Sequence, residues 1–348
     1  MATPNPSFTF SSDADLRRQG DRRFAAGVTF WAAAAGILWA GVLQVWAPAI
    51  TQLQNVRAGN VCRAESYLYD KPHWPMVIVG SSMVTDFDRL SQDGQCLSLF
   101  MAGHSAIPSL ELVASSVFRP RIVAVELNSL PVPPDDTVVQ EVRDSAFRFL
   151  KQQILAFRRS YQPASVIMTV CRMWFGQNAN ERGLNPPSDI FTKLRIKELR
   201  SQYETPPDTS ELVANVARAV ALAERLRGDG VKVVFFELPV PHGLADTPYH
   251  RSRRGITFAA VKDAGFEIVR FDDTGITTTD GVHLPYSQSR LVARDLVGRL
   301  RSDAGFAPGR SFCCSMIRII CLSGESSLTV ARSFLRTMIT HIVPLKPR

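Results

Sequence analysis

Five short runs rich in apolar residues recur along the central part of the chain, at residues 76–80, 97–101, 121–127, 232–238 and 267–271. Continuous apolar runs, as opposed to strictly alternating ones, are typical of parallel strands that are buried on both faces. We therefore interpret the five runs as strands of one parallel sheet.

Helical patterns lie between or after these runs, at residues 108–117, 211–227 and 286–300, and the second of them is strongly amphipathic. Strands that alternate with helices predict an α/β domain of three layers, in which helices cover both faces of a parallel sheet.

A long insertion, residues 129–210, separates the third and fourth predicted strands. It contains a predicted helical stretch at 138–159, and an irregular, aromatic segment follows at 160–189. Insertions of this length in a compact domain are usually functional lids or mobile segments. The alternative is a helical subdomain that only covers the sheet.

Residues 24–47 form an apolar stretch of 24 residues without a charge, long enough to cross a hydrocarbon core of about 30 Å. Four arginines precede it, at positions 17, 18, 22 and 23, and only Arg57 and Arg63 follow closely. This bias places the N-terminus in the cytoplasm and the rest of the chain outside. A cleaved signal peptide is the alternative, but the stretch is longer than a usual signal core. A buried helix of a soluble protein is a further alternative.

The chain is thus divided into a cytoplasmic tail at 1–23, a transmembrane helix at 24–47, an extracytoplasmic α/β domain at 48–305 and an atypical extension at 306–348. We expect a single-pass protein of the inner or plasma membrane. Arg318 and Arg332 interrupt the apolar runs of the extension, which makes it a poor second membrane helix.

The net charge of +8 does not indicate nucleic-acid binding, because residues 306–348 carry +5 of it. The remaining basic residues include the four arginines beside the membrane segment, and nucleic-acid recognition motifs are absent from the sequence. We therefore expect no nucleic-acid partner.

Six cysteines occur, and none lies at the spacing of a zinc site. We expect neither a metal nor another cofactor. Cys62 and Cys96 flank the first strand, where they form either a disulfide, if the domain is extracytoplasmic, or two buried thiols.

Candidate chemistry appears where predicted strands end. Asp280 precedes His283 by three residues, so its carboxylate can orient the imidazole and stabilise its protonated form. Ser82 follows the first strand at a turn that begins with Gly80. Gly103 follows the second strand and Asn128 ends the third. Because ligands bind at the carboxyl ends of parallel strands, we expect these residues to meet at one edge of the sheet.

This order of residues resembles the SGNH hydrolase family, also called GDSL-like, whose blocks carry Ser, Gly, Asn and Asp-x-x-His. The resemblance covers residues 77–300 and implies an SGNH, flavodoxin-like fold. It implies Ser82, Asp280 and His283 as the catalytic triad, with an oxyanion hole made by Ser82, Gly103 and Asn128. Two departures stand out: Ser81 replaces the family's Asp and is the second candidate for the nucleophile, and Asn128 sits in Glu-Leu-Asn instead of Gly-x-Asn-Asp.

The resemblance and the membrane segment together predict a membrane-anchored envelope enzyme, a serine-dependent esterase or O-acyltransferase. Its substrate would be an ester-linked acyl group, such as one carried by a cell-envelope polysaccharide in the periplasm. A non-catalytic anchored protein of the same fold, which helps a membrane acyltransferase assemble, is the alternative. A lipase-like enzyme whose aromatic insertion contacts lipid is a third hypothesis.

Overall fold

The computed structural model describes residues 13–45, 55–70, 74–85, 87, 96–143, 148–175 and 189–303. The chain divides into two compact units, Met1–Arg294 and Asp295–Arg348. Of the second unit, only residues 295–303 belong to the described part, and they form the end of a helix. The sheet and the candidate site lie in the first unit.

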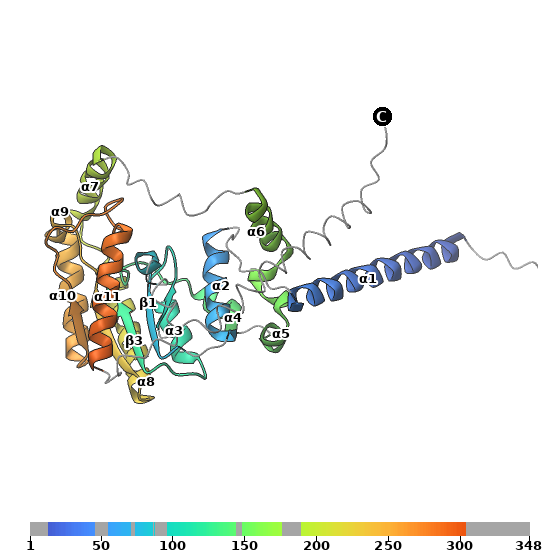
Figure 1. The fold of residues 1–348 in the computed structure, drawn as a ribbon, viewed down its shortest axis with the longest axis horizontal. Helices are drawn as coiled ribbons and strands as arrows, with labels where there is room; N and C mark the ends of the chain where they lie inside the picture. Colours follow the sequence, from blue (N-terminus) through green and yellow to red (C-terminus); the bar gives the residue numbers. More distant parts are fainter. Residues whose placement is uncertain are drawn as a thin grey trace, which may run out of the picture. The chain divides into compact units, whose positions relative to one another are not determined.

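A five-stranded parallel sheet forms the centre of the first unit (Figure 1). Its strands are β1 (Met76–Gly80), β2 (Cys96–Phe100), β3 (Ile122–Glu126), β4 (Lys232–Glu237) and β5 (Glu267–Arg270). The strand order is β2-β1-β3-β4-β5, and every neighbouring pair is parallel. Each strand lies within one residue of the apolar run that predicts it, so the predicted parallel sheet is confirmed.

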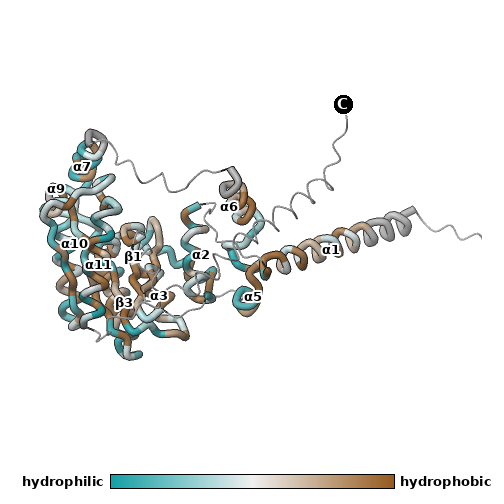
Figure 2. Tube along the Cα trace, viewed as in Figure 1, coloured by the Kyte–Doolittle hydropathy of each residue, from teal (hydrophilic) through white to brown (hydrophobic). Residues whose placement is uncertain are grey.

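The central strands carry apolar side chains on both faces. All residues of β1 and β3 are buried, as expected of strands covered by helices on each side. On one face Val77 and Val125 belong to a core that also contains residues of α2 (Val56–Tyr69), α3 (Ile107–Ser115) and α8 (Thr209–Gly228). On the other face Phe236 of β4 stacks on Phe87, with 6.5 Å between the ring centroids. Figure 2 shows apolar residues along β1 and β3.

The predicted helices are present with shifted ends. The amphipathic run 211–227 is α8, the run 108–117 is α3, and the last is α11 (Tyr286–Asp303). Helix α2, the short α9 (His242–Ala245) and α10 (Pro248–Asp263) were not predicted. Asn55 is the N-cap of helix α2: its side chain accepts a hydrogen bond from the Ala58 N–H at 2.7 Å, which satisfies a donor of the first turn.

The insertion is largely helical. Its described elements are α4 (Asp136–Arg143), α5 (Arg148–Gln153), the 3₁₀ turns η2 (Leu155–Phe157) and η3 (Arg159–Tyr161), α6 (Pro163–Phe175) and α7 (Asp189–Tyr203). The predicted helix at 138–159 is therefore divided into shorter elements. The prediction of irregular structure after residue 159 is wrong over α6, where apolar spacing produces an amphipathic helix despite the aromatic and β-branched residues.

Helix α1 (Asp13–Val45) contains the apolar stretch. Its segment Phe24–Val45 is long and apolar enough to cross a membrane (Figure 2), and 6% of an 18-residue apolar window in it is buried. Near its end the Trp39 indole N–H donates a hydrogen bond to the carbonyl of Tyr161 at 3.2 Å. Residues 46–47 of the predicted membrane helix, the beginning of the predicted tail and the extension at 306–348 lie outside the described residues.

Cys62, in α2, and Cys96, in β2, are separate buried thiols in this structure. The disulfide interpretation is therefore not the one that the structure adopts. Burial raises the pKa of the Cys62 thiol above its ordinary value.

Candidate active site

Ser82 stands at the start of a 3₁₀ turn, residues 82–85, that directly follows β1. Strand β1 has β2 on one side and β3 on the other, so its carboxyl end is the point where the strand order reverses. Open parallel sheets form their ligand sites at this point. The side chain of Ser82 is partly exposed, whereas Ser81 is 7% exposed.

Ser82, His283 and Asp280 form a hydrogen-bonded chain. The Ser82 Oγ lies 2.9 Å from His283 Nε2, and His283 Nδ1 lies 2.7 Å from Asp280 Oδ2. Serine and histidine are 201 positions apart in the sequence. With the imidazole proton on Nδ1, the Nε2 atom accepts the serine proton, which is the relation between a nucleophile and its general base.

The loop that carries Asp280 and His283 is held by its own backbone. Asp280 Oδ1 accepts hydrogen bonds from the backbone N–H groups of Val282, at 3.0 Å, and His283, at 2.7 Å. The Thr279 N–H donates to the His283 carbonyl at 2.8 Å, which closes the loop. Gly281 has a φ of +88°, a backbone conformation that residues other than glycine rarely adopt.

Asp280 remains ionised because its hydrogen bonds outweigh its partial burial. Burial raises the pKa of this carboxyl. The hydrogen bonds from the His283 ring and from two backbone N–H groups lower the pKa by more, so that it falls below its ordinary range. An ionised Asp280 keeps the proton of His283 on Nδ1 and stabilises the imidazolium.

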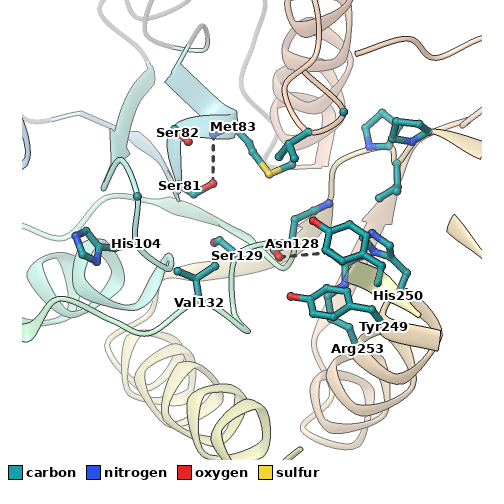
Figure 3. Close-up of a pocket in the computed structure, with 17 residues that line it drawn as sticks. Ser81, Ser82, Met83, His104, Asn128, Ser129, Val132, Tyr249, His250 and Arg253 are labelled. Carbon is teal, nitrogen blue, oxygen red and sulfur yellow. Dashed lines mark hydrogen bonds between the residues drawn. The ribbon is translucent and has the colours of Figure 1, made fainter. Parts of the chain in front are cut away.

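Ser81, the second candidate for the nucleophile, has a different environment. Its Oγ lies 3.0 Å from Glu126 Oε2, and its backbone N–H donates to the same oxygen at 2.6 Å. The Met83 N–H in turn donates to the Ser81 Oγ at 3.2 Å (Figure 3). Ser81 therefore fixes the turn, and Ser82 is the serine that reaches the imidazole.

Gly103 follows β2 and lines the same cavity as Ser82. Its φ is +78°, and a Cβ built on it would meet nothing within 4 Å, so its backbone faces open space. The preceding Ala102 is held by Asn60 of α2, a fully buried residue. The Asn60 amide donates to the Ala102 carbonyl at 3.1 Å, and its oxygen accepts the Ala102 N–H at 2.9 Å. Asn60 thus positions the loop of Gly103.

Asn128 joins the ends of β3 and β4. Its Nδ2 donates to the Leu238 carbonyl at 3.0 Å, and its Oδ1 accepts the Leu238 N–H at 2.7 Å. A carboxamide carries two N–H donors, so one of them remains for a ligand in the cavity that Asn128 lines. This pair of hydrogen bonds to Leu238 was not predicted.

These residues surround a cavity of about 210 Å³ (Figure 3). Ser82 and Gly103 lie on one part of its wall. Tyr203, Tyr249 and His250 contribute another part, which no sequence motif indicated. In Figure 3 Asn128 and Ser129 lie between Ser81 and the group formed by Tyr249, His250 and Arg253.

Helix α7 of the insertion packs on the loop of Asp280. Leu199 is so close to Gly281 that a Cβ on this glycine would lie 2.4 Å from Leu199 Cδ1. The Thr192 hydroxyl donates to the Thr279 carbonyl at 3.3 Å. The insertion therefore contributes to the site, through support of the loop and through Tyr203 at the cavity wall.

Sequence reasoning missed Glu126, Asn60 and the tyrosine wall. Glu126 did leave a signal, because a charged residue at the end of an otherwise apolar strand is rarely fully buried without a specific partner. His104, which follows Gly103, also lines the cavity, and its Nε2 lies 3.6 Å from Asp135 Oδ2. Within the described residues, no group of three or more His, Cys, Asp or Glu side chains is arranged to hold a metal ion.

Comparisons of the chain with protein-family models, with curated proteins and with solved structures found no match.

Proposed function

We propose that this protein is a serine-dependent esterase or O-acyltransferase of the SGNH type, anchored in a membrane by residues 24–47. The observation that carries the proposal is the chain from Ser82 Oγ through His283 to Asp280, with separations of 2.9 and 2.7 Å. Distances in this range are those expected of a nucleophile, its general base and the group that orients the base.

In the proposed reaction, His283 Nε2 takes the proton of Ser82 as its Oγ attacks the ester carbonyl carbon. The tetrahedral intermediate collapses, the bond to the leaving alcohol breaks, and the imidazolium returns its proton to that alcohol. Water or another hydroxyl then loses a proton to His283 and attacks the acyl group. The bond between the acyl carbon and Ser82 Oγ then breaks, and the imidazolium returns the proton to Ser82, which completes either hydrolysis or transfer.

The negative charge on the carbonyl oxygen requires donors that are already in place. The backbone N–H groups of Ser82 and Gly103 and the second N–H of Asn128 are the candidates, because these residues line one cavity. Loss of one such donor typically lowers the rate by about 10²–10³.

The SGNH assignment rests on the strand order and on the position of each motif residue at a strand end. The substrate class follows from the anchor: an extracytoplasmic domain tethered to a membrane has access to acylated carbohydrate of the cell envelope. Fold alone does not fix a substrate, so this part of the proposal depends on measured activity.

The test uses the full chain in detergent, with p-nitrophenyl acetate as substrate and a fluorophosphonate as a label for activated serine. We expect nitrophenolate release and labelling for the wild-type chain, and loss of both for Ser82→Ala. Ser81→Ala is the matched control, because it removes a neighbouring hydroxyl that is bound to Glu126; labelling should persist, at a reduced rate.

Unchanged hydrolysis by Ser82→Ala would remove Ser82 as the nucleophile. A wild-type chain that binds acylated carbohydrate but is neither labelled nor active would instead support the non-catalytic assembly protein.

A further inference from the structure

Two helices distant in sequence form an aromatic wall of the cavity. Tyr203 ends α7, and Tyr249 and His250 lie in the first turn of α10. The rings of Tyr203 and Tyr249 are stacked, with 4.6 Å between their centroids and 16° between their planes. His250 meets both tyrosines edge to face, at 5.0 and 5.4 Å. All three residues line the cavity that contains Ser82.

The imidazole of His250 is buried but has no hydrogen-bond partner. The residue is 6% exposed, and among the described residues neither Nδ1 nor Nε2 has a donor or acceptor. A buried polar group without a partner is costly, and in native proteins it usually marks a site that water or a ligand completes. Because His250 lines the cavity, a ligand there is the nearest candidate to complete its hydrogen bonds.

The two arginines next to this wall are already bound by a carboxylate. Arg253, 2% exposed, donates to the carboxylate of Glu237. Arg254 donates to the same carboxylate at 2.7 Å. Burial, reinforced by Arg253 and Arg254, lowers the pKa of His250 to about 3, so the imidazole is neutral at ordinary pH. A neutral imidazole has one N–H donor and one acceptor, the same pair of functions that a hydroxyl group offers in return.

We propose that Tyr203, Tyr249 and His250 form the subsite of a neutral sugar, whose apolar face packs on the tyrosine wall while one of its hydroxyls is bound by the imidazole. Tyrosine suits such a ligand because it combines a large apolar ring with a polar tip. Arg253, which lines the cavity, is already bound to Glu237, and an alkyl chain would leave the imidazole unpaired.

This inference rests on the proposed function, because the subsite would bind the sugar that accepts the acyl group from Ser82. A sugar hydroxyl beside acyl-Ser82 loses its proton to His283 Nε2 and its oxygen bonds to the acyl carbon. The bond between the acyl carbon and Ser82 Oγ breaks, and the imidazolium returns the proton to Ser82. His250 holds another hydroxyl of the same sugar, so it acts as a binding residue.

The experiment measures how the acetyl group partitions between water and an acceptor, in the full chain in detergent with p-nitrophenyl acetate as donor. The acceptors are methyl α-D-glucopyranoside, glucuronate and hexanol, and the acetylated products are measured by mass spectrometry. We expect transfer to the neutral glucoside to exceed transfer to the other two acceptors. His250→Leu should lower the ratio of transfer to hydrolysis about tenfold, the effect of one lost neutral hydrogen bond.

Two further variants separate binding from folding. His250→Gln retains a donor and an acceptor and should recover part of the ratio, while Arg251→Ala changes an exposed neighbour on α10 and should leave it unchanged. A ratio unaffected by His250→Leu, or equal transfer to hexanol or glucuronate, would overturn the subsite.

Failure of the proposed function has a different signature. A wild-type chain without nitrophenolate release or fluorophosphonate labelling is not an acyl-transfer enzyme, and saturation-transfer difference NMR with methyl α-D-glucopyranoside then decides the subsite alone. Glucoside signals that disappear in His250→Leu would support the subsite without the chemistry. Absence of signals with the wild-type chain would refute it.

Discussion

The carboxylate of Glu126 accepts the backbone N–H of Ser81 at 2.6 Å, and this contact joins the end of β3 to the turn that carries Ser82. Glu126 is fully buried, and burial raises the pKa of its carboxyl above the ordinary value although the bonds from Ser81 and the nearby Arg253 oppose this change. Glu126 binds Ser81, whereas the imidazole of His283 is hydrogen-bonded to Ser82 and Asp280. We interpret it as a positioning residue.

Replacement of Glu126 should therefore affect catalysis through geometry. Glu126→Leu leaves the Ser81 N–H buried and unpaired, which costs about 1–3 kcal/mol of stability. Displacement of the turn by even 1 Å should lower kcat about 10²-fold with little change in KM. Glu126→Gln keeps an acceptor for the Ser81 N–H and should retain most activity. Steady-state kinetics and urea denaturation measure both effects.

Glu141→Leu provides the control for this change. Glu141 makes a surface ion pair with Arg57, at 2.9 Å, and such pairs contribute about 0–1 kcal/mol. Equal effects of the leucine variants at positions 126 and 141 would contradict the positioning role.

Glycine is required at position 80 because the carboxylate of Glu126 approaches the backbone closely there. A Cβ on Gly80 would lie 2.5 Å from Glu126 Oε2 and 2.9 Å from Val84 Cγ2. Gly80→Ala should destabilise the fold by about 1–3 kcal/mol, the usual range for overpacking, and should displace Ser82. Gly255→Ala, in α10, is the control, because nothing lies within 4 Å of its Cβ and helical alanine should stabilise by about 0.5–1 kcal/mol. Thermal unfolding that shifts both variants in one direction would be inconsistent with this account.

Asp280 should act through the tautomer of His283. Asp280→Asn replaces an acceptor by an amide whose N–H₂ can donate to Nδ1. The imidazole proton then lies on Nε2, which can no longer accept the proton of Ser82. We expect kcat to fall by about 10²–10⁴, with intact stability within about 1 kcal/mol. Because the pKa of Asp280 is lowered, its carboxylate stays ionised through the neutral range and continues to orient the imidazole.

Asp272→Asn makes the same chemical change outside the cavity. Asp272 also accepts backbone and hydroxyl bonds in a loop, from Thr274 at 2.9 and 2.6 Å. A comparable loss of kcat in both variants would indicate a general effect of altered loops, and would count against the assigned role of Asp280.

The five parallel strands and the position of motif residues at their ends followed from the sequence, because apolar runs mark the strands and the residues that follow them reach the carboxyl edge of a parallel sheet. Ser82 and His283 meet for this reason although 201 positions separate them. Helix α2 was not predicted because its buried face includes Asn60 and Glu65, which read as solvent-exposed residues in a hydrophobicity pattern.

The rest of the site depends on tertiary contacts that leave no local pattern. Leu199 packs on Gly281, and Tyr203 stacks on Tyr249, only because the insertion returns to the sheet domain. The hydrogen bond from the Leu238 N–H to Asn128 likewise forms only because β3 and β4 are neighbours in the sheet. These contacts could be recognised only with the chain folded.

His250 should make the folded protein sensitive to acid. Burial, with Arg253 and Arg254, lowers its pKa in the folded state to about 3, whereas its ordinary value is 6.5. Between these values the unfolded chain binds a proton at this position and the folded chain does not, so stability falls as the pH falls. The other groups at the imidazole are the rings of Tyr203 and Tyr249, which remain protonated throughout this range.

One proton contributes about 1.4 kcal/mol per pH unit, so the stability of the wild-type chain relative to His250→Leu should decrease by about this amount for each unit below pH ~6. Urea denaturation from pH 7.5 to 4.5 measures the difference, and groups common to both chains cancel. Arg251→Ala should follow the wild-type curve, because it changes an exposed position on α10 and leaves the imidazole in place. Parallel curves for the wild-type chain and His250→Leu would mean that the imidazole is protonated equally in both states, and hence that it is open to water in the folded protein.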